Sequence, residues 1–140
     1  MIYKKSWKYI LFKDKSYYCK DLIYYKVKSI KTFRSLRKVP KGEIGGYVQG
    51  YYNLSQKGKC WIYDNAHVSG KAKVFGNAWV CENARVFGNA QIYGNAIVTG
   101  LASVFGNAQV FGNAIVCDRA KVCDNAIVKG NMVVTEETNI

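Results

Sequence analysis

Small and branched apolar residues recur in this chain at a fixed interval of six residues. In each repeat an alanine is followed two residues later by a valine or an isoleucine. Residues i and i+2 of a strand point to the same face, so both apolar side chains of an Ala-x-Val unit point inward. The alanines are Ala66, Ala72, Ala78, Ala84, Ala90, Ala96, Ala102, Ala108, Ala114, Ala120 and Ala126.

A six-residue repeat fits neither the 3.6-residue period of a helix nor one long strand. It predicts a short strand followed by a tight corner, and glycine or asparagine at the corner tolerates the positive φ that a sharp turn demands. Corners of this kind usually read Gly-Asn, as at Gly88-Asn89. Alanine suits the narrow inside of a coil, where a larger side chain costs roughly 1–3 kcal/mol by overpacking. The pattern therefore predicts an all-β chain wound as a parallel β-helix.

A slower period of eighteen residues indicates three faces per coil. The outward position after each alanine gives one apolar row, one wholly polar row and one mostly polar row. The rows are Trp61, Trp79, Ile97 and Ile115; His67, Arg85, Ser103 and Lys121; and Lys73, Gln91, Gln109 and Ile127. The residues after the aliphatic positions predict two aromatic ladders, Phe75–Tyr93–Phe111 and Phe87–Phe105. The units from Cys60 to Val134 amount to about four coils.

The repeat resembles the hexapeptide repeat of left-handed β-helix proteins. The lead-in from Val39 to Val48, the run Asn53–Gln56 and the Gly-Asn-Ala units are most similar to the YdcK-type β-solenoid family of bacterial and phage proteins. The resemblance covers about residues 39–134 and implies a left-handed, three-sided prism. This chain departs from the common hexapeptide in the residue after the aliphatic position, which is often Phe, Tyr or Cys.

The first fifty residues lack the repeat, and short alternating stretches at 9–12 and 22–28 predict strands with a turn at Asp14-Lys15. We divide the chain into a basic β-rich head at 1–50, a β-helix at 51–134 and a polar tail at 135–140. A short solenoid has two open ends, so the head is expected to cap the first coil.

The positive charge is concentrated in the head. Residues 1–50 carry a balance of +10 and the remainder +2, within a total of +12. Lysine and arginine neutralise phosphates and aromatic rings stack on bases, so this mixture favours nucleic acid or an acidic partner; a general solubilising charge is the alternative. The candidate contacts are Lys4, Lys5, Lys8, Lys26, Lys28, Lys31, Arg34, Arg37 and Lys38.

The five cysteines do not form a disulfide or zinc pattern, and no stretch approaches the length of a membrane span. Cys60 occupies an alanine position, so we expect it to point inward. Cys81 and Cys117 lie two coils apart, too far for a disulfide. We expect a cytoplasmic protein without a metal or another cofactor.

The sequence does not favour catalysis. Acyltransferases on related β-helices use a histidine together with a loop that projects from the prism. In this chain His67 is the sole histidine, and the uninterrupted repeat leaves no room for such a loop. Asp64, Glu82 and Asp118 share a corner column, where carboxylates accept backbone N–H bonds at turns. We therefore expect no enzyme and no small-molecule substrate.

The apolar row Trp61–Trp79–Ile97–Ile115 predicts an interface, because a contiguous apolar patch of this size is uncommon on a monomer. Three explanations stay open. The head folds over the row, two copies pack row to row as a homodimer, or a foreign protein docks there.

Together these features predict a non-enzymatic binding protein that engages a macromolecular partner. By analogy, a small, rigid and basic phage protein suits the inhibition of a host nucleic-acid-guided defence complex. A self-assembling structural scaffold is the alternative, and a hexapeptide-repeat acyltransferase is a third.

Overall fold

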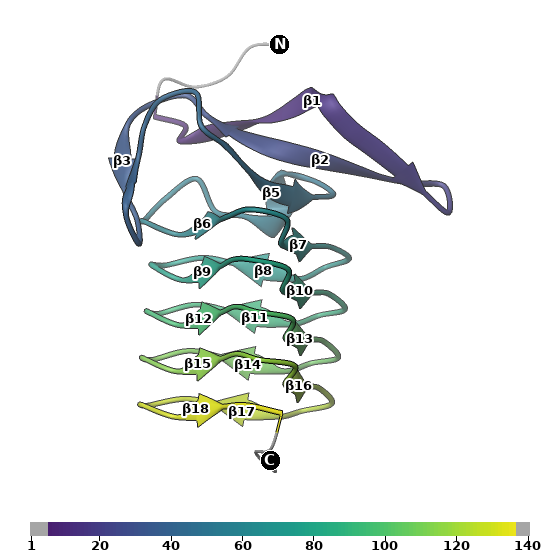
Figure 1. Ribbon diagram of the computed structural model, residues 1–140, viewed down its shortest axis with the longest axis vertical. Helices are drawn as coiled ribbons and strands as arrows, with labels where there is room; N and C mark the ends of the chain where they lie inside the picture. The colour runs from purple at the N-terminus through teal and green to yellow at the C-terminus, as the bar shows by residue number, and fades with distance from the viewer. Residues whose placement is uncertain (1–5, 137–140) are drawn as a thin grey trace.

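The computed structural model describes residues 6–136, and its solenoid consists of about five stacked turns below an antiparallel hairpin (Figure 1). The predicted all-β class and parallel stacking are confirmed. The handedness of the winding stays a prediction. Lys4 and Lys5 lie outside the described residues, as do the last four residues of the tail, 137–140.

The hairpin forms from β1 (Tyr9–Cys19) and β2 (Leu22–Ser29), which pair antiparallel with an irregularity between Phe12 and Tyr17. A second, much smaller hairpin follows, built from β3 (Phe33–Arg34) and β4 (Lys38–Val39). The strand β5 (Ile44–Val48) then pairs antiparallel with β2 and parallel with the solenoid strand β7 (His67–Val68). The head and the solenoid therefore share one continuous sheet.

Three stacks of short strands make up the solenoid. The first contains seven strands in the order β1-β2-β5-β7-β10-β13-β16; its last three are β10 (Arg85–Val86), β13 (Ser103–Val104) and β16 (Lys121–Val122). The second contains β8 (Lys73–Val74), β11 (Gln91–Ile92), β14 (Gln109–Val110) and β17 (Ile127–Val128). The third contains β6 (Trp61–Ile62), β9 (Trp79–Val80), β12 (Ile97–Val98), β15 (Ile115–Val116) and β18 (Val133–Val134). Partners are eighteen residues apart throughout the repeat, as in the pairing of Arg85 with Ser103.

The solenoid has about five turns rather than the four expected from the repeat, because residues without the Ala-x-Val pattern build the first turn. That turn comprises β5, a 3-10 helix η1 (Tyr51–Asn53), a bridge from Leu54 to Val74, and β6. Asn53 is fully buried: its side-chain oxygen accepts the N–H groups of Gln49 and Gly50, and its amide donates to the carbonyl of Ala72 at 2.8 Å.

The core is a single column of inward alanine and aliphatic side chains, nearly all at 0–1% exposure. The two aromatic ladders form as predicted: Phe75, Tyr93 and Phe111 stack at 4.8–4.9 Å, and Phe87 stacks on Phe105 at 4.8 Å with 1° between the rings. Asparagine side chains at the corners also hydrogen-bond from turn to turn, as from Asn77 to Asn95 at 3.3 Å.

Residues 6–136 contain no helix long and apolar enough to cross a membrane.

Candidate functional site

The outward face of the seven-stranded sheet carries a row of side chains that crosses from the head onto the solenoid. The strand register places one outward residue of each strand beside the next, and adjacent strands lie about 4.8 Å apart. From top to bottom the row is Phe12, Lys26, Tyr47, His67, Arg85, Ser103 and Lys121. It contains three cationic residues and no acidic residue, so it extends the basic character of the head down the solenoid.

His67 lies at the centre of an aromatic cluster, although its repeat position alone predicts a surface residue. Tyr47 stacks on its ring with centroids 4.5 Å apart, and Tyr17 and Tyr24 meet it edge-on at 5.9 Å and 5.6 Å. Tyr17 in turn stacks on Tyr24 at 5.0 Å. These contacts dock the far part of the β1–β2 hairpin against β7.

Both ring nitrogens of His67 are hydrogen-bonded. Nδ1 lies 2.8 Å from the carbonyl oxygen of Asn65, so Nδ1 carries the proton and donates it. Nε2 lies 2.5 Å from the hydroxyl of Tyr17. Burial raises the pKa of Tyr17, so this hydroxyl stays protonated and donates to Nε2.

Electrostatics keeps the imidazole neutral. Burial lowers the pKa of His67 below its usual value, and the nearby charges of Arg85 and Lys26 lower it further. The hydrogen bond to the Asn65 carbonyl acts in the opposite direction. The fixed positive charge at this point of the row is therefore that of Arg85, one strand below His67.

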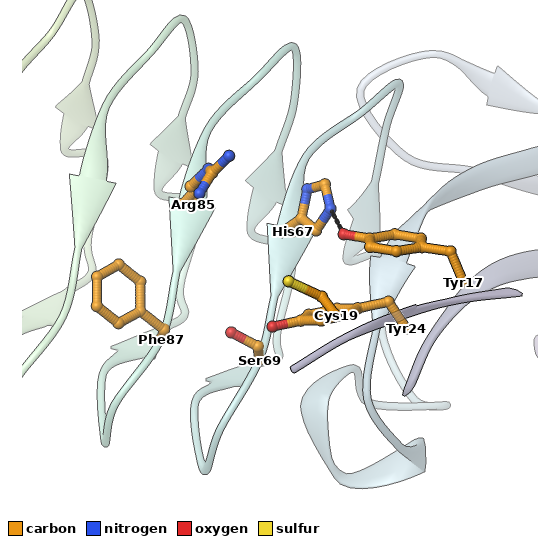
Figure 2. A pocket seen from close by; sticks show the side chains of 7 residues that line it. All are labelled: Tyr17, Cys19, Tyr24, His67, Ser69, Arg85 and Phe87. Atoms are coloured by element: carbon orange, nitrogen blue, oxygen red, sulfur yellow. Dashed lines mark hydrogen bonds between the residues drawn. The ribbon is translucent and has the colours of Figure 1, made fainter. Parts of the chain in front are cut away.

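A cavity of about 320 Å³ opens between the hairpin and the solenoid (Figure 2). Arg85 and Phe87 of the β10 segment stand on one side, and side chains from β1 and β2 stand on the other. Its lining residues are Tyr17, Cys19, Tyr24, His67, Ser69, Arg85 and Phe87, with no carboxylate among them. The cavity therefore combines aromatic surface, hydroxyl groups and a guanidinium.

The predicted basic contacts do not form one patch. Lys26 and Lys28 of β2 lie partly buried, with their ammonium groups over the rings of Tyr47 and Phe12 at 4.4 Å and 4.7 Å. Lys31 is exposed, and its ammonium donates to the carbonyl of Ser6. Three of the other four described contacts belong to the β3–β4 hairpin, whose Phe33 packs against Trp61 of the third stack: Arg34, Arg37 and Lys38.

Arg37 is engaged by neighbouring side chains: it forms an ion pair with Glu43 at 2.8 Å and lies over the ring of Tyr63.

Lys8 departs furthest from the predicted surface position. Its side chain is 1% exposed, and its ammonium donates to the carbonyl oxygen of Cys60 at 2.6 Å. Burial lowers the pKa of Lys8. Because Lys8 faces the interior, we remove it from the candidate nucleic-acid contacts.

The apolar row on the third stack is partly covered. Trp61 is fully buried against Phe33 of β3 and Tyr9 of β1, at centroid distances of 5.2 Å and 6.2 Å. Covering by the head therefore accounts for Trp61. Trp79, Ile97 and Ile115 are partly buried. The row continues to Val133, which is 54% exposed and was not part of the predicted row.

One carboxylate of the corner column hydrogen-bonds to the backbone of the next turn. The carboxylate of Asp64 accepts the backbone N–H of Glu82 at 3.2 Å, the role expected for corner acids. Asp64, Glu82 and Asp118 all have positive φ, between 56° and 59°.

Within the described part of the chain, no three His, Cys, Asp or Glu side chains gather in a way that could hold a metal ion. All five cysteines are free thiols.

The polar row, the aromatic cluster and the cavity were only partly accessible to sequence reasoning. The eighteen-residue period places Arg85 and Lys121 in one polar row, which is the signal that could have marked them as contacts. Tyr17, Tyr24 and Tyr47 lie outside the repeat, so their approach to His67 has no counterpart in the pattern.

The stacked parallel strands define this protein as a β-solenoid. Residues 90–106 match the family model of the YdcK beta solenoid repeat, which confirms the predicted resemblance for this part of the chain. No curated protein matches the chain.

Proposed function

We propose that this protein is a non-enzymatic binding protein whose seven-stranded face contacts the phosphates of a nucleic acid. The observation that carries the proposal is the outward row with Lys26, Arg85 and Lys121 and no acidic residue. Cations spaced along a rigid face suit a polyanion, because each contact releases counterions from its backbone. The net charge of +12 would add a long-range attraction.

The state of His67 supports a binding rather than a catalytic role. A general base needs a nitrogen that is free to take a proton from substrate. In His67, Nδ1 is bonded to Asn65 and Nε2 to Tyr17, and the sequence contains no second histidine. The acyltransferase alternative would therefore require the hairpin to leave this site.

The test is nucleic-acid binding by the full chain at several salt concentrations. Wild type is compared with Arg85→Gln/Lys121→Gln and with a control of equal charge, Lys73→Gln/Lys129→Gln. Lys73 and Lys129 are exposed on the second stack. For duplex DNA, log K should fall steeply with log salt, and the first variant should reduce the slope by about 0.9 per lost contact. Equal slopes for both variants, or no binding at low salt, would overturn the proposal.

The role that we propose for such a surface is interference with a complex that itself handles nucleic acid. The resemblance to bacterial and phage solenoids is the support for a phage-type inhibitor of a nucleic-acid-guided defence complex. Competition between this protein and a guide-bound nuclease for target DNA would test that role. Unchanged cleavage at saturating protein would remove it.

A homodimer is a second proposal, favoured by the uncovered lower part of the apolar row. Ile97, Ile115 and Val133 follow one another on adjacent strands and end at an exposed residue. Two such rows related by a two-fold axis form a self-complementary contact. The scaffold alternative is less favoured, because the head lies over the first turn and so covers one of the two ends that end-to-end stacking would need (Figure 1).

A further inference from the structure

The ladder of Phe87 and Phe105 stops at the cavity. Phe105 occupies one face of the Phe87 ring, 4.8 Å away and nearly parallel to it. One turn above, the same corner position holds Ser69, because the backbone N–H of Ser69 pairs with Val86, the residue before Phe87. A serine reaches much less far than a ring, so the upper face of Phe87 is left open toward the cavity. Phe87 is 37% exposed, and both residues line the cavity.

We call the space above the open face of Phe87 the slot, and the side chains around it define the kind of ligand that it can hold. A planar ring on the upper face of Phe87 would continue the aromatic ladder by one step, at the position where Ser69 leaves room. The guanidinium of Arg85 lies in the same cavity, and a planar fork of N–H donors suits a phosphate or carboxylate. The hydroxyl groups of Ser69 and Tyr24 can exchange hydrogen bonds with ring substituents.

The electrostatics also favours an anionic ligand. Both ring nitrogens of His67 are engaged by Asn65 and Tyr17, so Arg85 is the cationic group of the cavity lining that is left to contact an anion. The side chains lining the cavity include no carboxylate that would repel a phosphate. The cavity volume of about 320 Å³ lies at the lower end of the range for small-molecule sites, about 300–1,000 Å³.

We propose that this cavity receives one base of a single-stranded nucleic acid, stacked on Phe87, with the adjoining phosphate on Arg85. The inference rests on the proposed function, because the row of Lys26, Arg85 and Lys121 would hold the backbone on either side of the base. A base held in a duplex cannot reach the slot without being unpaired. The protein should therefore prefer single strands.

The experiment measures fluorescence anisotropy of a labelled oligothymidylate of about twelve nucleotides with the full chain. Two further probes are an abasic strand with the same number of phosphates and a duplex of the same length. The variants are Phe87→Ala, which removes the stacking surface, and Ser69→Phe, which fills the slot with a ring of the protein itself. Phe75→Ala is the matched control, because Phe75 is the upper ring of the other ladder and follows β8 on the second stack.

Oligothymidylate should bind wild type more tightly than the abasic strand or the duplex. Phe87→Ala and Ser69→Phe should each weaken its binding by roughly 5- to 150-fold, the effect of losing one base stack. Neither variant should alter the affinity for the abasic strand, and Phe75→Ala should alter none of the affinities. Ser69→Phe also guards against misfolding, since it adds a ring to an existing ladder, and unchanged thermal unfolding would verify this.

Two results would overturn the inference, and they differ in what they say of the proposed function. Equal binding of the three probes, insensitive to Phe87→Ala and Ser69→Phe, would remove the base slot and leave the phosphate-contacting face in place. The absence of binding to all three probes at low salt would remove both. A salt-dependent affinity for the abasic strand separates these cases.

Discussion

The hydroxyl of Tyr17 lies 2.5 Å from Nε2 of His67, although the two residues are fifty positions apart in the chain. This contact joins the β1–β2 hairpin to the second turn of the solenoid. Since Nδ1 of His67 donates to Asn65, Nε2 accepts the Tyr17 hydroxyl only while the imidazole is neutral. Docking of the hairpin is therefore linked to the protonation state of one residue.

The free energy of unfolding should fall as the pH falls below 6.5, the usual pKa of histidine. The folded protein holds the pKa of His67 below that value, so the unfolded chain takes up the proton first. The contribution is complete above pH 6.5 and is lost on acidification, until His67 in the folded state is also protonated. The groups around the ring are Tyr17, Tyr24 and Tyr47, the cations Lys26 and Arg85, and the Asn65 carbonyl. The Asn65 carbonyl favours an imidazolium, but burial and the two cations oppose it, and the pKa of His67 is lowered overall.

Urea unfolding between about pH 8 and about pH 5.5 measures this dependence. The control is His67→Gln, whose amide oxygen still accepts a hydroxyl but does not titrate. The variant should lack the part of the decrease that begins near pH 6.5. Parallel curves for the two proteins would show that His67 does not couple pH to stability.

Two glycines of one corner column should differ in how well they tolerate alanine. Gly94 and Gly130 have nearly the same φ, +65° and +62°, so alanine meets a comparable left-handed penalty of about 1 kcal/mol at each. A Cβ on Gly94 would lie 2.8 Å from the backbone nitrogen of Gly112, whereas a Cβ on Gly130 meets nothing within 4 Å. Gly94→Ala should therefore lower the free energy of unfolding more, as measured in urea. Equal losses would mean that backbone conformation alone decides the cost.

The same comparison applies to the inward alanines. Ala90 and Ala126 precede strands of the second stack two turns apart, but Ala90 is fully buried and Ala126 only partly. Ala90→Val should cost about 1–3 kcal/mol by overpacking. Ala126→Val should cost clearly less, because its surroundings in the last turn can yield. Thermal unfolding of the two variants gives the ranking, and a larger loss at Ala126 would contradict it.

The repeat predicts the solenoid because each six-residue unit follows the same local rule, in which an inward alanine and an inward aliphatic residue are followed by a corner. The Ala-x-Val pattern and the eighteen-residue rows suffice to place Val86 inward, Arg85 outward and Phe87 above Phe105. The first turn has no such rule. Its geometry depends on single side chains, such as Gln56, whose amide accepts the N–H groups of Lys8 and Tyr9 and donates to the carbonyl of Tyr9.

The candidate site was harder to predict because it forms where two different patterns meet. The head contributes Tyr17 and Tyr24, the repeat contributes His67 and Arg85, and only the tertiary fold brings them together. The concentration of charge in the head also gave a wrong prediction for Lys8, which was expected to be an exposed contact and is buried. A lysine in a basic segment is expected in solvent, but three acceptors belonging to Gly58 and Cys60 surround its ammonium in the interior.

The homodimer proposal predicts a response to charge on the apolar row of the third stack. Ile97→Glu places a carboxylate between Trp79 and Ile115, where a contact with a second copy would bury it away from water. The desolvation of an unpaired charge is costly enough to disfavour association. Gln91→Glu is the matched control, since Gln91 holds the same repeat position on the second stack of the same turn and is exposed.

Light scattering coupled to gel filtration, at several concentrations, reads out the result. Wild type and Gln91→Glu should have the mass of a dimer, and Ile97→Glu that of a monomer. Loss of the dimer in both variants would point to net charge rather than the row. A monomeric wild type would remove the homodimer and leave Ile97, Ile115 and Val133 as surface of a single chain, in which case the covering of Trp61 by Phe33 accounts for the strongest part of the apolar signal.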